Sequence, residues 1–496
     1  MKLRASLLLL SSGKKIQIST LVLFCIFTGI IRGILEGLFF DASALKPALI
    51  LSYVPFYTIM FLTILMILKY AGGLSEANIY RVPLAALFLG IFPPLIDLIH
   101  RGGMDQNIRY GYYLELFFPQ KIPNGLFFYY MPEYRVPLGE TIIIWATILL
   151  TAFYARMRRS TWFRTGFVLV SVYLLFFIHS CLIPSVLRLW ISSNSQNLYG
   201  YDLNLVIPLM QMFLSLISYL ILRKISLIYI LKRLLHIGPF LLIYGVGAVN
   251  FPLHSILWAS FTILLFFIFF TLIVQNDFYD LAEDARQNRK RHFIHADLIF
   301  FTAMMTFALI LLSAYNLTLS LFLFIILLCG ILYSFPFYRG KGKIFPTMKF
   351  EGIWGAMSFL AGAIPLSPTK VQSEILIQLL LVFLGWSFFA LLKDVKDIRA
   401  DYKAGQSSIY IAFYRRKKKL RDVHRLLMTA YTFALLIVPA FYALQGRIFA
   451  SMSLLFFVIV FAIIAFYVKL RIKVQGLLAA INGYLLILLL ITLKIF

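Results

Sequence analysis

The chain has 496 residues, of which 61% are hydrophobic and only 13% are charged, and its formal net charge is +26. Roughly a quarter of the residues of a typical soluble domain are charged, so the composition excludes an ordinary soluble protein and predicts an all-α, polytopic membrane protein. The basic residues lie in short loops between apolar stretches rather than on one soluble face. This distribution follows the positive-inside rule and argues against nucleic acid as a partner.

Apolar stretches of about 20 residues, the length that crosses the hydrocarbon core, recur along the whole chain. About six precede residue 223, at 16–40, 47–69, 82–99, 138–155, 165–190 and 203–222. About nine follow, at 237–253, 255–275, 298–314, 317–333, 351–367, 374–392, 425–444, 448–468 and 476–493. We therefore predict two membrane modules, residues 1–222 and 223–496, joined through the basic stretch from Arg223 to Arg233.

Basic clusters give the predicted orientation of these spans. If the spans alternate, every cluster falls on one side of the membrane, which the positive-inside rule identifies as the cytoplasmic side. The clusters lie at 14–15, 156–164, 223–233, 286–291, 339–343, 415–425 and 469–473. The sequence therefore predicts a multi-pass protein of the inner (plasma) membrane, with the segment near 100–137 outside.

Two acidic runs follow apolar stretches on the predicted cytoplasmic side. The first contains Asn276, Asp277, Asp280 and Asp284, and the second contains Asp394, Asp397 and Asp401. On a helix that advances about 100° per residue, the first set spans about 100° of the surface and the second about 60°. Such rows of oxygen ligands suit Mg²⁺, which keeps other positions for water and substrate phosphate oxygens.

The two runs complete the patterns N-D-x-x-D-x-x-x-D and D-x-x-D-x-x-x-D, and at these residues the chain resembles the UbiA family of membrane-embedded prenyltransferases. The resemblance extends to Arg291 after the first run, although His292 replaces the proline that usually follows. It also extends to Lys403-Ala404-Gly405 after the second run. A loop between them, with Tyr333 and Pro336 before Arg339, Lys341 and Lys343, is similar to a third cytoplasmic loop of the family. The resemblance covers roughly residues 225–496 and implies a nine-helix bundle.

The resemblance implies an enzyme that transfers an isoprenoid chain from a prenyl diphosphate to an aromatic or lipid-precursor acceptor, as in quinone or lipid biosynthesis. It implies that Mg²⁺ assists the reaction and that membrane lipids surround the protein. The implied metal ligands are Asn276, Asp277, Asp280, Asp284, Asp394, Asp397 and Asp401. The six aspartates among them are also the implied catalytic residues. The implied substrate-binding residues are Asn276, Arg291, Tyr333, Lys341 and Lys403.

Two other functions compete with this interpretation. A CDP-alcohol phosphotransferase also uses acidic residues at a membrane surface, but it requires an Asp-Gly dipeptide, which the chain lacks. A lipid-handling or transport scaffold with an inactive prenyltransferase-like half predicts eroded acidic motifs, whereas all six motif aspartates are present. The scaffold function stays open for the protein as a whole, because no motif assigns a role to residues 1–222.

Four ionisable residues in the amino-terminal module lie within or beside apolar stretches. Arg32 and Glu36 are four residues apart inside one stretch, and Asp97 and His100 lie near the end of another. Ionisable residues inside a membrane are functional candidates by default. An i, i+4 pair that only neutralises itself is the simpler interpretation, and the sequence favours it.

Overall fold

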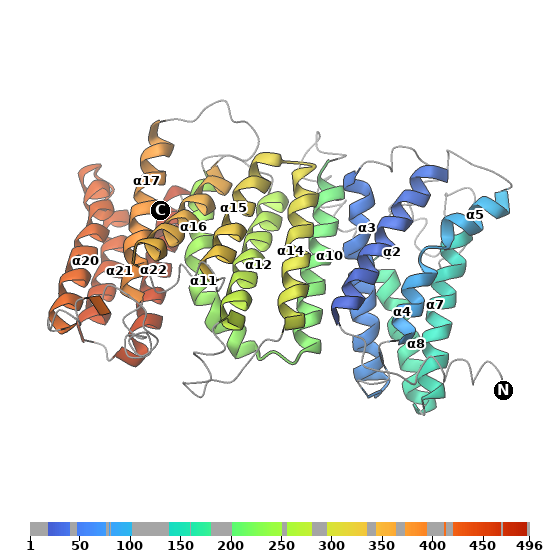
Figure 1. Cartoon of the computed structure of the whole chain (residues 1–496). Coiled ribbons are helices and arrows are strands. Elements are labelled where there is room, and N and C mark those ends of the chain that lie inside the picture. The colour runs from blue at the N-terminus through green and yellow to red at the C-terminus, as the bar shows by residue number, and fades with distance from the viewer. Residues whose placement is uncertain are drawn as a thin grey trace. The chain divides into compact units, whose positions relative to one another are not determined.

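The computed structural model describes fourteen stretches of the chain, and their regular structure is entirely helical. They are residues 18–39, 47–75, 79, 81–101, 138–158, 160–179, 201–249, 255–279, 295–334, 344–363, 373–393, 411–412, 420–467 and 470–493. The prediction of an all-α fold is thereby confirmed. The chain divides into two compact units, residues 1–224 with 306–315, and residues 225–305 with 316–496 (Figure 1).

The amino-terminal unit is built on two closely packed helices, α2 and α3. A Cβ atom added at Gly29 would lie 2.8 Å from Val54, and one added at Gly33 would lie 2.8 Å from Ile50. Small residues allow this backbone approach, as in other membrane helix pairs. The helices of the unit are α2 (Ile18–Phe39), α3 (Pro47–Met66) with the π-helix η2 (Ile67–Ala71), α4 (Arg81–Leu89), α5 (Pro93–Arg101), α7 (Leu138–Met157), α8 (Trp162–Phe177) and α10 (Tyr201–Leu222).

The predicted span 82–99 is wrong as one continuous helix. The chain forms α4 and then α5, with a turn at residues 90–92 between them. Pro93 and Pro94 explain the break, because proline has no N–H for the helix ladder and its ring clashes with the preceding turn. Proline is compatible with the first turn of a new helix, where it begins α5.

The second unit holds the helices on both sides of the two acidic runs, although the last part of α14, from residue 306, belongs to the first unit. They are α11 (Leu227–Val249), α12 (Ser255–Tyr279), α14 (His295–Ser313), α15 (Leu317–Ser334), α16 (Ile344–Ala363), α17 (Ser373–Lys393), α20 (Leu420–Leu444), α21 (Ile448–Tyr467) and α22 (Leu470–Thr492). Contacts run from α11 through α12, α15, α16, α17, α20, α21 and α22 and return to α11, which also packs on α16.

The helix that follows the basic stretch between the modules begins earlier than predicted. Helix α11 begins at Leu227, ten residues before the predicted span, so Lys232 and Arg233 belong to this helix. The connection between α10 and α11 is therefore short, and Lys224 turns the chain with φ of 55°. One consequence is that Arg233 has a fixed position on a helix.

Two prolines in the second unit each leave a helix carbonyl without its usual N–H donor, and side chains of α22 donate to both carbonyls. Pro239 cannot donate to the carbonyl of Leu235, which instead accepts a 3.0 Å hydrogen bond from Asn482. Pro439 likewise leaves the carbonyl of Leu435 without its usual donor, and the Tyr484 hydroxyl donates to it at 3.2 Å. Backbone groups freed in apolar surroundings need such partners, so α22 stabilises α11 and α20.

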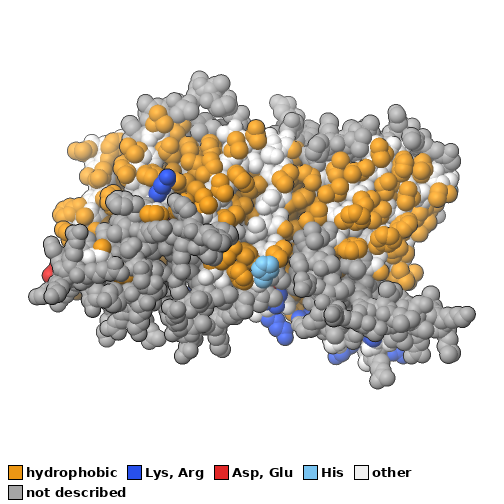
Figure 2. Space-filling view, viewed as in Figure 1, with side chains coloured by type: hydrophobic (Ala, Val, Ile, Leu, Met, Phe, Trp, Pro, Cys, Tyr) orange, Lys and Arg blue, Asp and Glu red, His pale blue; other side chains and the backbone are white. Residues whose placement is uncertain are grey.

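Nine helices in the described residues are long and apolar enough to cross a membrane, three before residue 225 and six after it. Large hydrophobic side chains such as Leu149 and Leu426 are exposed on these helices, and hydrophobic side chains cover much of the described helix surface in Figure 2. The chain is therefore a multi-pass membrane protein. The prediction of about six spans before residue 223 exceeds the three that qualify there.

Candidate active site

The carboxyl end of α12 carries the first two residues of the first acidic run, Asn276 and Asp277. Arg233 on α11 binds Asp277 through Nη2, which lies 2.8 Å from Oδ1 and 2.5 Å from Oδ2. The hydroxyl of Tyr229 donates a hydrogen bond to the same carboxylate. Since Tyr229 and Arg233 are four residues apart, one face of α11 holds Asp277 from two positions.

This arrangement places a positive charge beside the acidic run. The Arg233 side chain is 29% exposed and the Asp277 side chain 15%, so both groups are accessible to a small polar ligand. Guanidinium groups bind phosphate oxygens in a planar, forked geometry, and carboxylate oxygens bind Mg²⁺. Asp277 therefore offers an oxygen ligand for a metal ion, and Arg233 offers a group that can bind the phosphate oxygens of a metal-bound diphosphate.

Sequence reasoning missed both α11 residues. Arg233 belongs to a basic cluster that the positive-inside rule explains, so the sequence alone gave no reason to separate it from Lys232. The spacing of Tyr229 and Arg233 on one helical face was the available signal. Only the packing of α11 on α12 shows which carboxylate they reach.

Tyr333, the predicted substrate-side tyrosine, lies near the carboxyl end of α15 and is buried. Its ring centroid is 5.3 Å from that of Trp354 and 6.2 Å from that of Phe350, both in edge-on contact. Helix α15 packs against α12 and α16. Tyr333 is thus a rigid member of the helix bundle, held by aromatic contacts with α16.

An aromatic cluster joins the helices that lead into the predicted motif loops. Phe240 on α11 stacks on Phe269 of α12 with ring centroids 4.1 Å apart, and it meets Trp386 of α17 edge-on at 4.8 Å. Trp354 on α16 contacts both Phe240 and Phe269 at 6.3 Å. The cluster therefore packs α12 and α17 together with α11 and α16, and Tyr333 joins α15 to it through Trp354.

A buried carboxylate lies within the same core. Glu351 on α16 is 3% exposed and accepts a 3.1 Å hydrogen bond from the indole N–H of Trp386. The other indole, that of Trp354, donates to the carbonyl of Ile326 at 3.2 Å. Buried polar groups require such partners, so these bonds fix both tryptophans. The sequence analysis did not identify Glu351, whose burial only the bundle reveals.

The structure describes three of the predicted site residues, Asn276, Asp277 and Tyr333, and places them near the carboxyl ends of two packed helices. The remaining predicted residues lie outside the described residues. They are Asp280, Asp284, Arg291, Lys341, Asp394, Asp397, Asp401 and Lys403. Within the described stretches, no group of three or more His, Cys, Asp or Glu residues could hold a metal ion.

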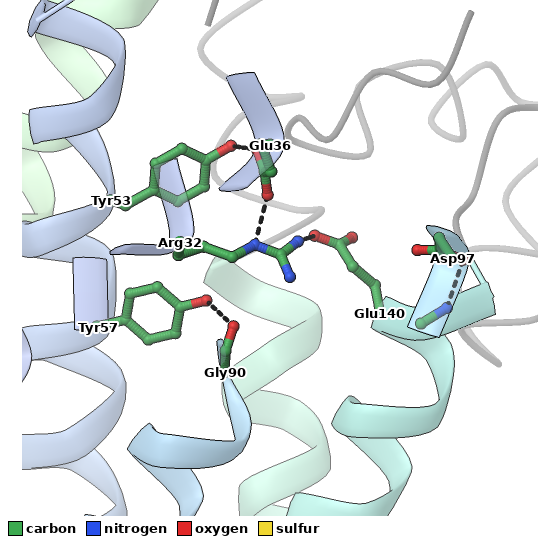
Figure 3. Close-up of polar contacts among 8 residues, drawn as sticks. Arg32, Glu36, Tyr53, Tyr57, Gly90, Asp97 and Glu140 are labelled. Carbon is green, nitrogen blue, oxygen red and sulfur yellow. Dashed lines mark hydrogen bonds and ion pairs between the residues drawn. The ribbon is translucent and has the colours of Figure 1, made fainter. Parts of the chain in front are cut away.

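A second polar site lies in the amino-terminal unit, where Arg32 contacts two carboxylates (Figure 3). Its Nε donates to Glu36 Oε1 at 2.5 Å, and its Nη2 donates to Glu140 Oε1 on α7 at 3.0 Å. The hydroxyl of Tyr53 on α3 donates to Glu36 Oε2. We call these four residues the Arg32 cluster. It corrects the interpretation of Arg32 and Glu36 as a pair that only neutralises itself.

Asp97, the other charged candidate of this unit, is buried and accepts a 2.9 Å hydrogen bond from the backbone N–H of Gly139. A carboxylate is favourable at the amino end of a helix such as α7. Gly139 lies so close to α5 that a Cβ atom there would be 2.2 Å from the carbonyl oxygen of Pro93. Asp97 therefore holds α7 against α5, while His100 is exposed.

Comparison with known proteins gives one family match. Residues 237–477 match the UbiA prenyltransferase family, a range that includes both acidic runs. A solved structure described as "Structural and mechanistic insights into the biosynthesis of Digeranylgeranylglyceryl phosphate synthase in membranes" matches with a TM-score of 0.38 and 19% identity. That match covers 58% of this chain and 99% of the other. Comparison with curated proteins gives no significant match.

Residues 237–477 therefore belong to the UbiA prenyltransferase family, as the resemblance in the acidic runs predicted. The chain is a membrane protein whose carboxyl-terminal half contains a prenyltransferase domain. The family match begins after α10, so the Arg32 cluster lies outside it.

Proposed function

We propose that the chain transfers an isoprenoid group from a prenyl diphosphate to an aromatic or lipid-precursor acceptor, with the help of Mg²⁺. One observation carries this proposal: the UbiA-family segment contains two complete acidic runs, and Arg233 and Tyr229 bind the first carboxylate of the first run at a helix end. An inactive scaffold has no need to maintain seven oxygen ligands in family spacing.

The donor set fits a hard divalent cation, because the acidic runs supply carboxylate and amide oxygens. The residues that would hold Mg²⁺ are Asn276, Asp277, Asp280, Asp284, Asp394, Asp397 and Asp401. When bound, Mg²⁺ neutralises charge that develops on the departing diphosphate.

Positively charged side chains of the protein would also bind the diphosphate. We propose that Arg233 joins Arg291, Lys341 and Lys403 in binding diphosphate oxygens, since guanidinium and ammonium groups are the usual phosphate ligands. Tyr229 orients the Asp277 carboxylate by its hydrogen bond. The ring of Tyr333 would lie beside the reacting end of the prenyl chain, where an aromatic face favours a developing cation.

We also propose how the two modules are arranged in the membrane. Residues 223–496 would form the nine-helix catalytic bundle, with the motif loops on the cytoplasmic side of the inner membrane as the basic clusters predict. Residues 1–222 would form a separate membrane module with further spans. The acceptor is proposed only as a class, an aromatic ring or a lipid precursor.

The transfer activity can be tested with the purified full-length chain in lipid. Labelled prenyl diphosphates of several chain lengths are incubated with Mg²⁺ and a pooled extract of membrane lipids and metabolites, and products are identified by mass. We expect one donor class to give a product heavier than its acceptor by the prenyl group. A folded protein that forms no prenylated product with any donor would favour the lipid-handling scaffold instead.

A further inference from the structure

Three helices of the amino-terminal unit that are long enough to cross a membrane end at one corner of that unit. These spans are Ile50–Ala71, Leu138–Met157 and Leu205–Leu222. The hydroxyl of Ser160, between α7 and α8, donates to the carbonyl of Gly72 after η2 at 3.2 Å. Lys69 Nζ donates to the carbonyl of Leu222 at 3.4 Å. We call this place the basic corner and define it as residues 66–75, 154–165 and 219–224.

Two arginines of the basic corner are held in place by uncharged groups. Arg156 Nη1 donates to the carbonyl of Ser160 at 2.8 Å, and its guanidinium group lies 4.4 Å from the centre of the Trp162 ring. The guanidinium group of Arg158 lies 5.4 Å from the centre of the Tyr154 ring. Cation–π contacts of this kind fix the position of a positive charge without neutralising it.

A third arginine, Arg164, lies against the backbone at Gly73, where an added Cβ atom would be 2.3 Å from its Nη1. In the described part of the chain, none of these three guanidinium groups pairs with a carboxylate. Glu76, the acidic residue nearest to the corner along the sequence, lies outside the described residues. Lys and Arg side chains gather at the lower edge of the described surface in Figure 2, below the hydrophobic side chains. Positive charge concentrated in this way attracts an anion.

Arg158 indicates that the anion has oxygen atoms that accept hydrogen bonds. Its Nη2 is buried and has no hydrogen-bond partner among the described residues. Buried donors are normally paired, and a guanidinium group binds the oxygens of a phosphate in a planar, forked geometry. A phosphate group would supply both the acceptor and the negative charge, whereas a water molecule would supply the acceptor alone.

An apolar surface continues from the basic corner along α8. Phe163, Phe167, Val170 and Leu174 are all exposed and follow one another at intervals of three or four residues, so they lie on one face of the helix. Phe163 is 84% exposed and Trp162 is 74% exposed. Tryptophan is typical of the boundary between lipid headgroups and acyl chains. A ligand of the corner therefore meets cations at one end and an apolar helix face at the other.

We propose that the basic corner binds the phosphate headgroup of an anionic phospholipid, whose acyl chains lie along the exposed face of α8. The positive-inside rule accounts for the number of cations on this side of the membrane, but not for arginines that are held in fixed positions. Anionic lipids of the cytoplasmic leaflet are attracted to such groups of basic residues. The corner lies outside the family match, so this site does not depend on the proposed transferase activity.

Mass spectrometry of the intact full-length protein tests this proposal, because it counts the lipids that stay bound. The protein in non-ionic detergent is titrated with phosphatidylglycerol or with phosphatidylcholine of the same acyl chains. We expect the wild type to bind phosphatidylglycerol about tenfold more tightly than phosphatidylcholine. The double variant Arg156→Gln/Arg158→Gln should lose most of this preference. Arg164→Gln is a second variant that leaves the contacts of Ser160 intact, and it should weaken the preference.

Lys232→Gln/Arg425→Gln is the matched control, since it removes two exposed cations from helices of the other unit and lowers the net charge equally. It should keep the wild-type preference. Thermal unfolding identifies folded variants. The proposal would be overturned if the wild type showed no preference, or if the control lost as much of it as the double variant. Wild-type preference in the folded double variant, or in Arg164→Gln if the double variant does not fold, would also overturn it.

A competition experiment distinguishes a lipid site from a site for free phosphate. Glycerol 3-phosphate carries the phosphate group of the lipid but no acyl chains. We expect it to displace phosphatidylglycerol from the wild type only at a large excess, because the exposed face of α8 contributes to lipid binding. Displacement at an equal concentration would show that the corner binds a free phosphate and would contradict the proposal.

Discussion

Replacement of Asp277 by asparagine is expected to lower the rate of Mg²⁺-dependent diphosphate release by about a thousandfold, the upper range for loss of one charge-stabilising group. Asparagine keeps the size of the side chain but removes the charge that pairs with Arg233 and that we propose binds Mg²⁺. Membrane insertion should be unchanged, because the residue lies at a helix end. The rate is measured with saturating prenyl diphosphate, and Mg²⁺ affinity is obtained from its concentration dependence.

Asp422→Asn provides the control for this change. Asp422 is exposed in the first turn of α20, in the same unit, and has no proposed role in metal binding. It should retain the wild-type rate. Normal turnover by a folded Asp277→Asn variant would contradict the assignment of the first acidic run.

Replacement of Arg32 by methionine is expected to produce the largest loss of stability in the amino-terminal unit, about 3–5 kcal/mol. Methionine fills a similar volume but leaves Glu36, which is 2% exposed, without its neutralising partner. The cost is that of an isolated buried charge and exceeds the value of the ion pair itself. Thermal or denaturant unfolding of the full-length protein in detergent measures the change.

A second substitution separates this charge effect from packing. Adding Glu36→Gln to the Arg32→Met variant removes the isolated charge and should recover part of the lost stability. Arg164→Met is the matched control, because Arg164 lies on the surface near the start of α8 and should change stability little. Equal destabilisation by the single and double variants would show that packing around Arg32 dominates.

The sequence predicted the helices of this protein well because their signal is local. Each predicted apolar range overlaps a helix in the described residues, since length and hydropathy decide whether a segment can cross a membrane. The exceptions depend on individual residues, whose effect is lost when hydropathy is averaged over a segment. Prolines at 93 and 94 break one span, and α11 extends through Lys232 and Arg233 although these residues lower its hydropathy.

The sites were less predictable because their contacts join helices that are distant in sequence. The motif spacing predicted the family and made Asp277 a candidate site residue, but Arg233 lies 44 residues earlier and could not be paired with it from the sequence. Glu140 lies 108 residues after Arg32, so the sequence showed only the local pair with Glu36. Such pairings become visible only when it is known that α11 packs on α12 and that α7 brings Glu140 to Arg32 of α2.

The central claim is that the two acidic runs act together on a prenyl diphosphate, and diphosphate release by Asp280→Ala and Asp397→Ala variants tests it most directly. Each variant is purified at full length in lipid and compared with the wild type, with and without Mg²⁺, after thermal unfolding has confirmed that it is folded. We predict Mg²⁺-dependent release by the wild type and none above background by either variant. Release by either variant at the wild-type rate, or release by the wild type without Mg²⁺, would contradict the claim.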